Sequence, residues 1–437
     1  MNSDRRVVIT GMGQVSPFGN SIEELAEGLQ EQRSAVGPVD AAFQEGLSVL
    51  FGGTAEKFTG HIGNFGDLEK AQLRSIRKNL KVMCREIQMG VAVAQLALQD
   101  AGLKPEECEA TRSGVVFGCD HIMTIPSEIS TGIIASRNEN KEYEFSRWAE
   151  HGLPEVNPLW LLKYLPNMPA SHVAIFNDFQ GPNNSLTMRE AGGNLAIAES
   201  AGYIARGSAD LMLAGATGTC LHPVRSVHVC LQQPLAKHND PTAASRPFDV
   251  DRNGVVLGEG AGVVCLENLD HAEKRNAKIW GEVVGSGSSI AASGGKPDIT
   301  KALVNAIKVT FDSAGISPEE ACGEIGHVHA HGVSHVDLDI AEARAIAEVF
   351  GTEKVPPVTA AKSYFGHLGA GGGVVELIGS LLSLDSGRLF KLLNCENLDP
   401  NCPIRPAVEG DSAGSSVLNL SVTPLGQASA LLVKKFE

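Results

Sequence analysis

The sequence predicts an α/β protein made of two similar halves, each with a mixed or parallel sheet. Its 437 residues, 43% of them hydrophobic and 48 of them glycine, fit a globular enzyme with close backbone packing and tight turns. Apolar strand-like runs alternate with segments of helical period. The alternation restarts near residue 270, which suggests a duplication. We therefore expect halves at 1–270 and 271–437.

The first half opens with a strand and a capped helix. Residues 6–19 predict a buried strand followed by a Gly-rich turn, and Ser21 is the expected cap of a helix that reaches Leu29. Gly11 and Gly13 form a Gly-x-Gly, but the third glycine and the acidic strand end of a dinucleotide site are missing. A nucleotide cofactor is therefore not expected.

Residues 70–88 concentrate positive charge in an otherwise acidic chain. They include Arg77, Lys78 and Lys81. Either this is a solvated helix face or it docks an acidic partner, for which a focused basic patch is useful. A helix then continues to Gly102. The irregular, Trp- and Pro-containing segment 121–170 is predicted to cover a site or to form an interface.

The segment 181–200 predicts an extended run that turns near Glu190 and enters a helix at about Ala191. Enzymes of the α/β class often place a nucleophile at such a turn, because free N–H groups and the helix dipole stabilise negative charge there. In this chain the position carries a carboxylate. From this stretch alone, Glu190 is either a functional group or merely an acidic residue that the dipole favours.

The remaining elements follow the same alternation. A turn-dense loop at 244–262 indicates a functional or strained corner. The expected strands are 211–216, 263–266, 279–284, 328–331 and 358–360, and the expected second-half helices are 301–315 and 340–350.

Two loops of the second half carry histidines. His331 and His367 each lie beside glycine near the end of a predicted strand, where open α/β sheets gather their sites. One such histidine alone would more often be a core or surface residue. Two in matching contexts, with Lys362 five residues before His367, indicate function.

Composition excludes several other classes. The net charge of −15 argues against general binding to nucleic acid or to an anionic membrane. The nine cysteines lack the spacing of a zinc site, and we expect reduced thiols and no metal. No window approaches the roughly 20 apolar residues of a membrane span, and the N-terminus lacks signal-peptide features. We expect a soluble, cytoplasmic protein with no membrane insertion.

Five motifs together carry a family resemblance. They lie at 6–24, 181–185, 244–264, 330–342 and 362–373. The chain resembles the β-ketoacyl-acyl carrier protein synthases of the type II condensing-enzyme class, in the thiolase-like superfamily. The resemblance implies a five-layered αβαβα fold, a dimer, and acyl carrier protein as partner. It implies no cofactor beyond the carrier's phosphopantetheine thioester, which brings the substrate.

The resemblance also implies roles for individual residues. His331 and His367 match the two family histidines, and Lys362 matches the motif lysine. Glu190 falls where the family has its nucleophilic cysteine. Supporting acidic positions are matched by Asp339, Glu342 and Glu376, and the family's carrier-binding basic positions by Arg77, Lys78 and Lys81.

Two departures from the family bear on chemistry. A thiolate carries an acyl group as a reactive thioester, whereas attack by Glu190 would give a mixed anhydride that hydrolyses readily. The family's C-terminal Gly-Phe-Gly-Gly loop supplies an oxyanion-hole N–H. An ungapped alignment places Pro424, which has no N–H, at that donor position.

The first hypothesis is therefore an enzyme that decarboxylates malonyl-carrier thioesters without an acyl-enzyme. His331 and His367 would stabilise the enolate, and Glu190 would shape the site or shuttle a proton. The dipole favours an ionised Glu190 and burial favours a protonated one, so its state stays open. The alternatives are a noncatalytic chain-length-factor-like partner of a Cys-bearing ketosynthase, as a heterodimer in place of a homodimer, and an unorthodox condensing enzyme.

Overall fold

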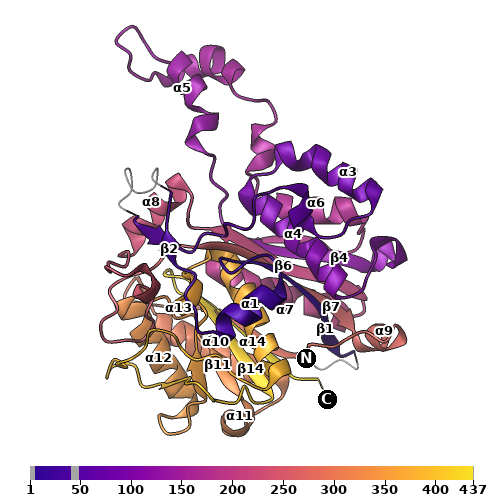
Figure 1. Ribbon diagram of the computed structural model, residues 1–437, viewed down its shortest axis with the longest axis vertical. Helices are drawn as coiled ribbons and strands as arrows, with labels where there is room; N and C mark the ends of the chain where they lie inside the picture. Colours follow the sequence, from indigo (N-terminus) through magenta and orange to yellow (C-terminus); the bar gives the residue numbers. More distant parts are fainter. Residues whose placement is uncertain (1–4, 41–48, 437) are drawn as a thin grey trace.

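The computed structural model describes residues 5–40 and 49–436, and eleven of its strands form one large mixed sheet (Figure 1). The eleven strands lie in the order β13-β12-β11-β14-β15-β8-β1-β7-β6-β4-β5. The bounds on the first-half side are β1 (Val7–Val15), β7 (Glu259–Asn268), β6 (Leu211–Thr219), β4 (Ser113–Cys119) and β5 (Asn183–Thr187). Those on the second-half side are β8 (Gly281–Ile290), β15 (Gln427–Lys434), β14 (Ser416–Val422), β11 (His327–His329), β12 (Pro357–Thr359) and β13 (Arg405–Pro406).

Both sides of this sheet repeat one pairing pattern. From β1 outward, β7 and β6 pair antiparallel, and β4 and β5 then continue in parallel. From β8 outward, β15 and β14 pair antiparallel, and β11 and β12 continue in parallel. The strands of the two sides are joined where Val8 and Ile9 of β1 pair with Glu282 and Gly281 of β8. The boundary that we propose near residue 270 falls in the short helix α9 (Leu269–Lys274), between β7 and β8.

Helices cover the two sides in layers. Between them lie α7 (Gly192–Ala205) and α14 (Gly372–Ser386), which both contact strands of each half (Figure 1). The outer layers contain α4 (Arg85–Asp100) with α6 (Met168–Asn177), and α10 (Ile299–Ala314) with α12 (Val336–Phe350). The fold is therefore the expected five-layered αβαβα arrangement. The central helices are largely buried, with eight of the 14 residues of α7 and twelve of the 15 residues of α14 buried, as the central layer requires.

The remaining elements are short or peripheral. The helices are α1 (Ile22–Gln30), α3 (Lys70–Asn79), α5 (Ser130–Ala135), α8 (Pro223–Gln232), α11 (Pro318–Glu324) and α13 (Lys362–Phe365). The strands are β2 (Gly37–Pro38), β3 (Phe51–Gly52), β9 (Ala292–Ser293) and β10 (Lys296–Pro297).

The first strand corrects one prediction. Gly11 and Gly13 lie inside β1 and do not form a turn. A side chain on either glycine would collide with α4, because a Cβ on Gly13 would come within 2.1 Å of the Val93 carbonyl oxygen. The Gly-x-Gly thus lets a helix approach the sheet closely. The predicted cap is confirmed, since Ser21 accepts from the Glu24 N–H and forms a capping box.

The irregular segment projects from the body as an arm (Figure 1, top). It leaves the sheet after β4 and returns at α6, and it contains α5 and several single-turn helices. Apolar side chains along it are exposed, including Phe145 at 77% and Ile134 at 57%.

The second-half elements lie close to their predicted positions. α12 begins at Val336, earlier than the expected 340, because the His335 side chain accepts the N–H groups of Asp337 and Leu338 and caps the helix there. β7 also begins earlier than expected, at Glu259. The predicted strand at 328–331 ends at His329, which leaves His331 in the loop that follows β11.

Candidate active site

Glu190 lies on the predicted strand–turn–helix. β5 ends at Thr187, a single 3₁₀ turn spans Arg189–Ala191, and α7 follows from Gly192. Arg189 has a left-handed φ of 52°, which is strained for a residue with a side chain and makes the turn sharp. Gly118 of β4 supports the turn, because a Cβ there would lie 2.5 Å from the Gly192 carbonyl. The Glu190 side chain is only 2% exposed.

His367 lies on the equivalent approach to α14. It follows α13 and a left-handed Gly366, and its N–H donates to the Val256 carbonyl at 2.8 Å. A 3₁₀ turn at Gly369–Gly371 then leads into α14. Gly218 of β6 gives this turn room, because a Cβ there would lie 2.7 Å from the Ala370 nitrogen.

Two buried carboxyl groups shape the loop that carries His331. Glu342 accepts the N–H of His331 at 2.6 Å and that of Gly332 at 2.8 Å. Asp339 accepts the N–H of Val333 at 3.1 Å and that of Phe248 at 3.0 Å. Burial raises the pKa of Glu342 to about 7 and that of Asp339 to about 6. Both act on backbone, so they position the loop.

Burial and the neighbouring Lys362 determine the charge and the tautomer of His331. Its Nζ lies 2.5 Å from Glu376 Oε1 and 3.3 Å from His331 Nδ1, and all three side chains are buried. Burial, and then the charge of Lys362, hold the pKa of His331 well below its usual range, so the ring is neutral. An ammonium group can only donate, so Nδ1 accepts and the proton of this imidazole resides on Nε2. His331 can therefore donate from Nε2.

His367 and Glu190 are in direct contact. His367 Nε2 lies 3.2 Å from Glu190 Oε1, and the two histidine rings are 5.9 Å apart, nearly perpendicular. Burial acts to raise the pKa of Glu190, but the hydrogen bond from His367 and the charge of Arg189 outweigh it and bring the pKa well below its ordinary value. Glu190 is thus a carboxylate, which can only accept, and His367 donates Nε2–H to it.

Sequence reasoning missed Arg189. Its Nη2 lies 3.2 Å from Glu190 Oε1, and its side chain is 13% exposed. The available signal was a cation adjacent to Glu190 at the turn itself. The motif lysine, Lys362, pairs instead with Glu376.

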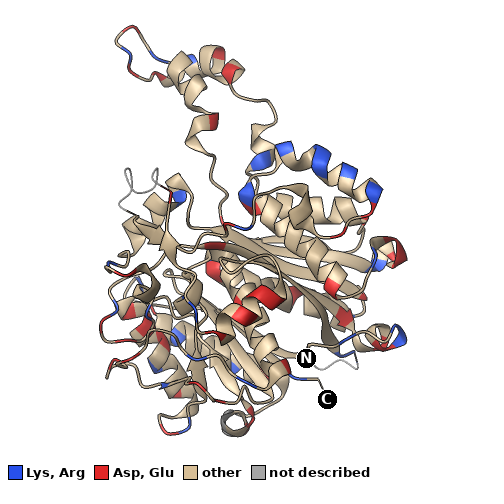
Figure 2. Ribbon diagram, in the orientation of Figure 1, with Lys and Arg blue, Asp and Glu red and all other residues tan. Residues whose placement is uncertain are grey.

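The other predicted residues belong to different elements. Pro424 lies in the β14–β15 turn, where Thr423 N–H donates to Gln427 O and Leu425 is 54% exposed. This hairpin touches the Glu190 turn through Ser429 Oγ, which donates to the Ala191 carbonyl at 3.3 Å. Arg77, Lys78 and Lys81 are exposed on and just after α3, where the ribbon in Figure 2 is repeatedly blue for Lys and Arg.

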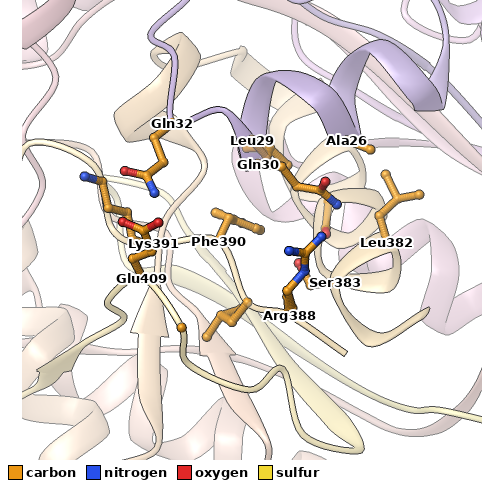
Figure 3. A pocket seen from close by; sticks show the side chains of 13 residues that line it. Ala26, Leu29, Gln30, Gln32, Leu382, Ser383, Arg388, Phe390, Lys391 and Glu409 are labelled. Carbon is orange, nitrogen blue, oxygen red and sulfur yellow. The ribbon is translucent and has the colours of Figure 1, made fainter. Parts of the chain in front are cut away.

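A separate cavity of about 230 Å³ lies between α1 and the second half of α14 (Figure 3). Ala26, Leu29, Ser383, Arg388 and Phe390 contribute to its wall. It is lined by the far part of α14, whereas Glu190 and His367 lie toward the start of that helix.

Within residues 5–40 and 49–436, no helix is long and apolar enough to cross a membrane. The same residues contain no group of three or more His, Cys, Asp or Glu side chains arranged to hold a metal ion. The described cysteines, eight of the nine, are free.

The layered fold and the paired histidines beside a helix-terminal turn define the class of thiolase-like condensing enzymes. Residues 4–272 match the beta-ketoacyl synthase N-terminal domain, and residues 280–396 match the corresponding C-terminal domain. The chain belongs to the beta-ketoacyl synthase family.

Curated relatives cover nearly the whole chain. The 3-oxoacyl-[acyl-carrier-protein] synthase 2 of Coxiella burnetii is 32% identical over 92% of this chain and 91% of its own length. The protein of the same name from Synechocystis sp. is 30% identical, over 92% and 90%. The family assignment therefore places the chain among ketosynthases of fatty acid or polyketide synthesis.

Solved structures give the same fold. A beta-ketoacyl synthase from Burkholderia phymatum superposes with a TM-score of 0.84 at 27% identity, over 99% of this chain and 100% of that one. The ishigamide ketosynthase/chain length factor superposes with a TM-score of 0.79 at 25% identity, with the same coverage.

Proposed function

We propose that this protein decarboxylates malonyl groups carried as thioesters on acyl carrier protein, without forming an acyl-enzyme. The observation that carries the proposal is the state of His331. Lys362 and burial keep it neutral with its proton on Nε2, which suits it to donate to a thioester oxygen as that oxygen becomes an enolate.

The charges around the site support the same reaction. Glu190 pairs with Arg189, Lys362 pairs with Glu376, and all four side chains are at most 13% exposed. A malonyl carboxylate entering these surroundings would meet cations that already have partner ions. Loss of CO₂ leaves the negative charge on the enolate, where it is spread over the thioester oxygen and the α-carbon. Poor solvation therefore destabilises the carboxylate more than the enolate.

The reaction balances with one solvent proton. The bond between the malonyl carboxylate and its α-carbon breaks, CO₂ leaves, and the electron pair forms the thioester enolate. Protonation of the α-carbon gives the acetyl thioester. Glu190 would shape the site and would not shuttle this proton, because a carboxylate whose pKa lies well below its ordinary value is a weak base.

The basic face of α3 is the proposed carrier-binding surface. Arg77, Lys78 and Lys81 are exposed there, and no ion pair engages them within the described part of the chain. A carrier with an acidic face would meet unshielded positive charge on an otherwise acidic protein. We also propose that the protein works as a dimer, with a second copy or with a related ketosynthase.

The test is to incubate the purified protein with malonyl-acyl carrier protein and to measure the intact mass of the carrier. Conversion to acetyl carrier is expected. His331→Ala should lower the rate about 100- to 1,000-fold, the usual effect of losing one oxyanion donor. The exposed His238→Ala serves as the matched control and should retain full activity. Conversion no faster than without protein would refute the proposal.

A second candidate function is a noncatalytic subunit that pairs with a Cys-bearing ketosynthase. It is favoured by the similarity to a ketosynthase/chain length factor at 25% identity, and by the engagement of His367 Nε2 with Glu190. Co-expression with a Cys-bearing ketosynthase separates the two. A stable heterodimer whose activity survives His331→Ala would support the subunit, whereas a homodimer with its own turnover would support the enzyme.

A further inference from the structure

A chain of buried ionic groups extends from Glu190 to α8. Arg189 Nη2 is 3.2 Å from Glu190 Oε1, and Arg189 Nε is 3.7 Å from Asp120 Oδ2. Asp120 also pairs closely with Arg225. The four side chains are between 2% and 13% exposed, and their charges alternate along the chain.

These groups come from separate elements. Asp120 follows β4, Arg189 lies in the turn between β5 and α7, and Arg225 lies in the first turn of α8. Gln232, the last residue of α8, accepts from Arg189 Nη1 at 3.1 Å. The guanidinium group is therefore held from two further elements. This explains how the left-handed backbone of Arg189 persists, since strain of that kind needs surroundings that fix it.

We propose that Arg189, held by Asp120 and Gln232, is a positioning residue that fixes the Glu190 carboxylate against the imidazole of His367. A direct consequence concerns the substrate. As long as this contact lasts, His367 Nε2–H is bonded to Glu190 and is withheld from a thioester oxygen, which leaves His331 as the donor. This role of Arg189 is the same whether the protein is an enzyme or a partner subunit.

Other charged and titratable groups also surround Glu190, but the two other cations, Lys362 and Arg225, are paired with carboxylates other than Glu190. Lys362 pairs with Glu376, and Arg225 pairs with Asp120. Arg189 is the cation in contact with Glu190, and its bond is to the same Oε1 that His367 contacts. The groups that face Glu190 from the surrounding elements are His367, Arg189, Asp120, Arg225, Cys220, His331 and Lys362.

The experiment is a pH titration by NMR of the full-length protein labelled with ¹³C at the glutamate side-chain carboxyl carbon. The Glu190 resonance is assigned by its loss in Glu190→Gln. In Arg189→Met the midpoint of Glu190 should rise by about 1 to 3 pH units, the usual effect of removing an opposite charge at contact distance. Arg225→Met should give a smaller rise, because Asp120 then draws Arg189 away from Glu190.

Conservative and remote variants complete the design. Arg189→Lys keeps the charge and should restore most of the wild-type midpoint. Arg189→Gln removes the charge but keeps a polar side chain. It should show the same rise in the midpoint as Arg189→Met, and it replaces Arg189→Met if that variant does not fold. Arg112→Met removes an arginine from an ion pair with Asp210 away from the site and should leave Glu190 unchanged. A Glu190 midpoint that is the same in wild type, Arg189→Met and Arg189→Gln would overturn the inference. Because the readout is a titration, its failure is separable from failure of malonyl decarboxylation.

Discussion

The turns that precede the two central helices share a backbone and differ in chemistry. Each is a single 3₁₀ turn, and the helix begins at the glycine that follows it, Gly192 for α7 and Gly372 for α14. The first turn contains Arg189, Glu190 and Ala191, and the second contains only glycine and alanine. One topology therefore provides charge in one half and close backbone packing in the other.

The difference shows how the site is divided. The second half supplies both histidines and the buried Lys362–Glu376 pair, and its own turn is free of ionisable side chains. The first half supplies a carboxylate that is tied to Arg189 and through it to Asp120. Because the ionised Glu190 reaches across to His367, the first half controls a donor that belongs to the second.

The largest effect is expected from breaking the ion pair of the second half. In Glu376→Gln the buried Lys362 loses its partner ion and keeps its contact with the neutral His331. The free energy of unfolding should therefore fall by about 3 to 5 kcal/mol. Glu190→Gln should cost less, because Arg189 keeps Asp120 and Gln232. Urea denaturation of both variants measures the difference. Glu324→Gln, which breaks a surface pair with Lys434, is the control and should cost at most about 1 kcal/mol.

Introducing a thiol at position 190 tests whether the first turn can carry an acyl group. After incubation with acyl-carrier thioester, the wild type should show no added mass, and Glu190→Cys should show the acyl adduct, because a helix terminus favours thiolate. Adding Pro424→Gly should speed loading about 100-fold if the missing N–H limits it. Intact-mass spectrometry follows both reactions. An acyl adduct on the wild type would contradict the assignment of Glu190 as a group that holds no acyl chain.

Alanine scanning of the supporting glycines compares the two turns directly. Gly118→Ala puts a Cβ 2.5 Å from the Gly192 backbone, and Gly218→Ala puts one 2.7 Å from the Ala370 nitrogen. Each should lower stability by about 1 to 3 kcal/mol, as overpacking generally does. Gly37→Ala, which meets open space, is the control. Thermal unfolding measures all three, and a neutral Gly118→Ala would show that the first turn tolerates displacement.

The smallest effects are expected outside both turns. Replacing Arg77, Lys78 and Lys81 by alanine should weaken carrier binding, each by up to about 1 kcal/mol, with the loss greatest at low salt. Removing three other exposed lysines, Lys104, Lys237 and Lys354, leaves the same net charge and is the control. Titration calorimetry with acyl carrier protein reports the difference. Equal weakening by both sets would indicate bulk charge and would exclude a docking face on α3.

What the sequence could predict was local. The strand–turn–helix at Glu190, the two histidine loops and the cap at Ser21 each lie within one contiguous stretch, so periodicity and turn chemistry reveal them. The ionisation of Glu190 could not be read in this way, because it depends on His367, which is 177 residues away in sequence. The prediction of a turn at Gly11 and Gly13 was wrong for the same reason, since the helix that packs against these glycines, α4, lies far along the chain.

The glycines that hold the two turns against the sheet have a consequence for substitutions at position 190. Gly118 and Gly218 pack against the main chain of these turns from the sheet side. We therefore expect a change of side chain at position 190 to alter the chemistry of the site more than the path of the backbone.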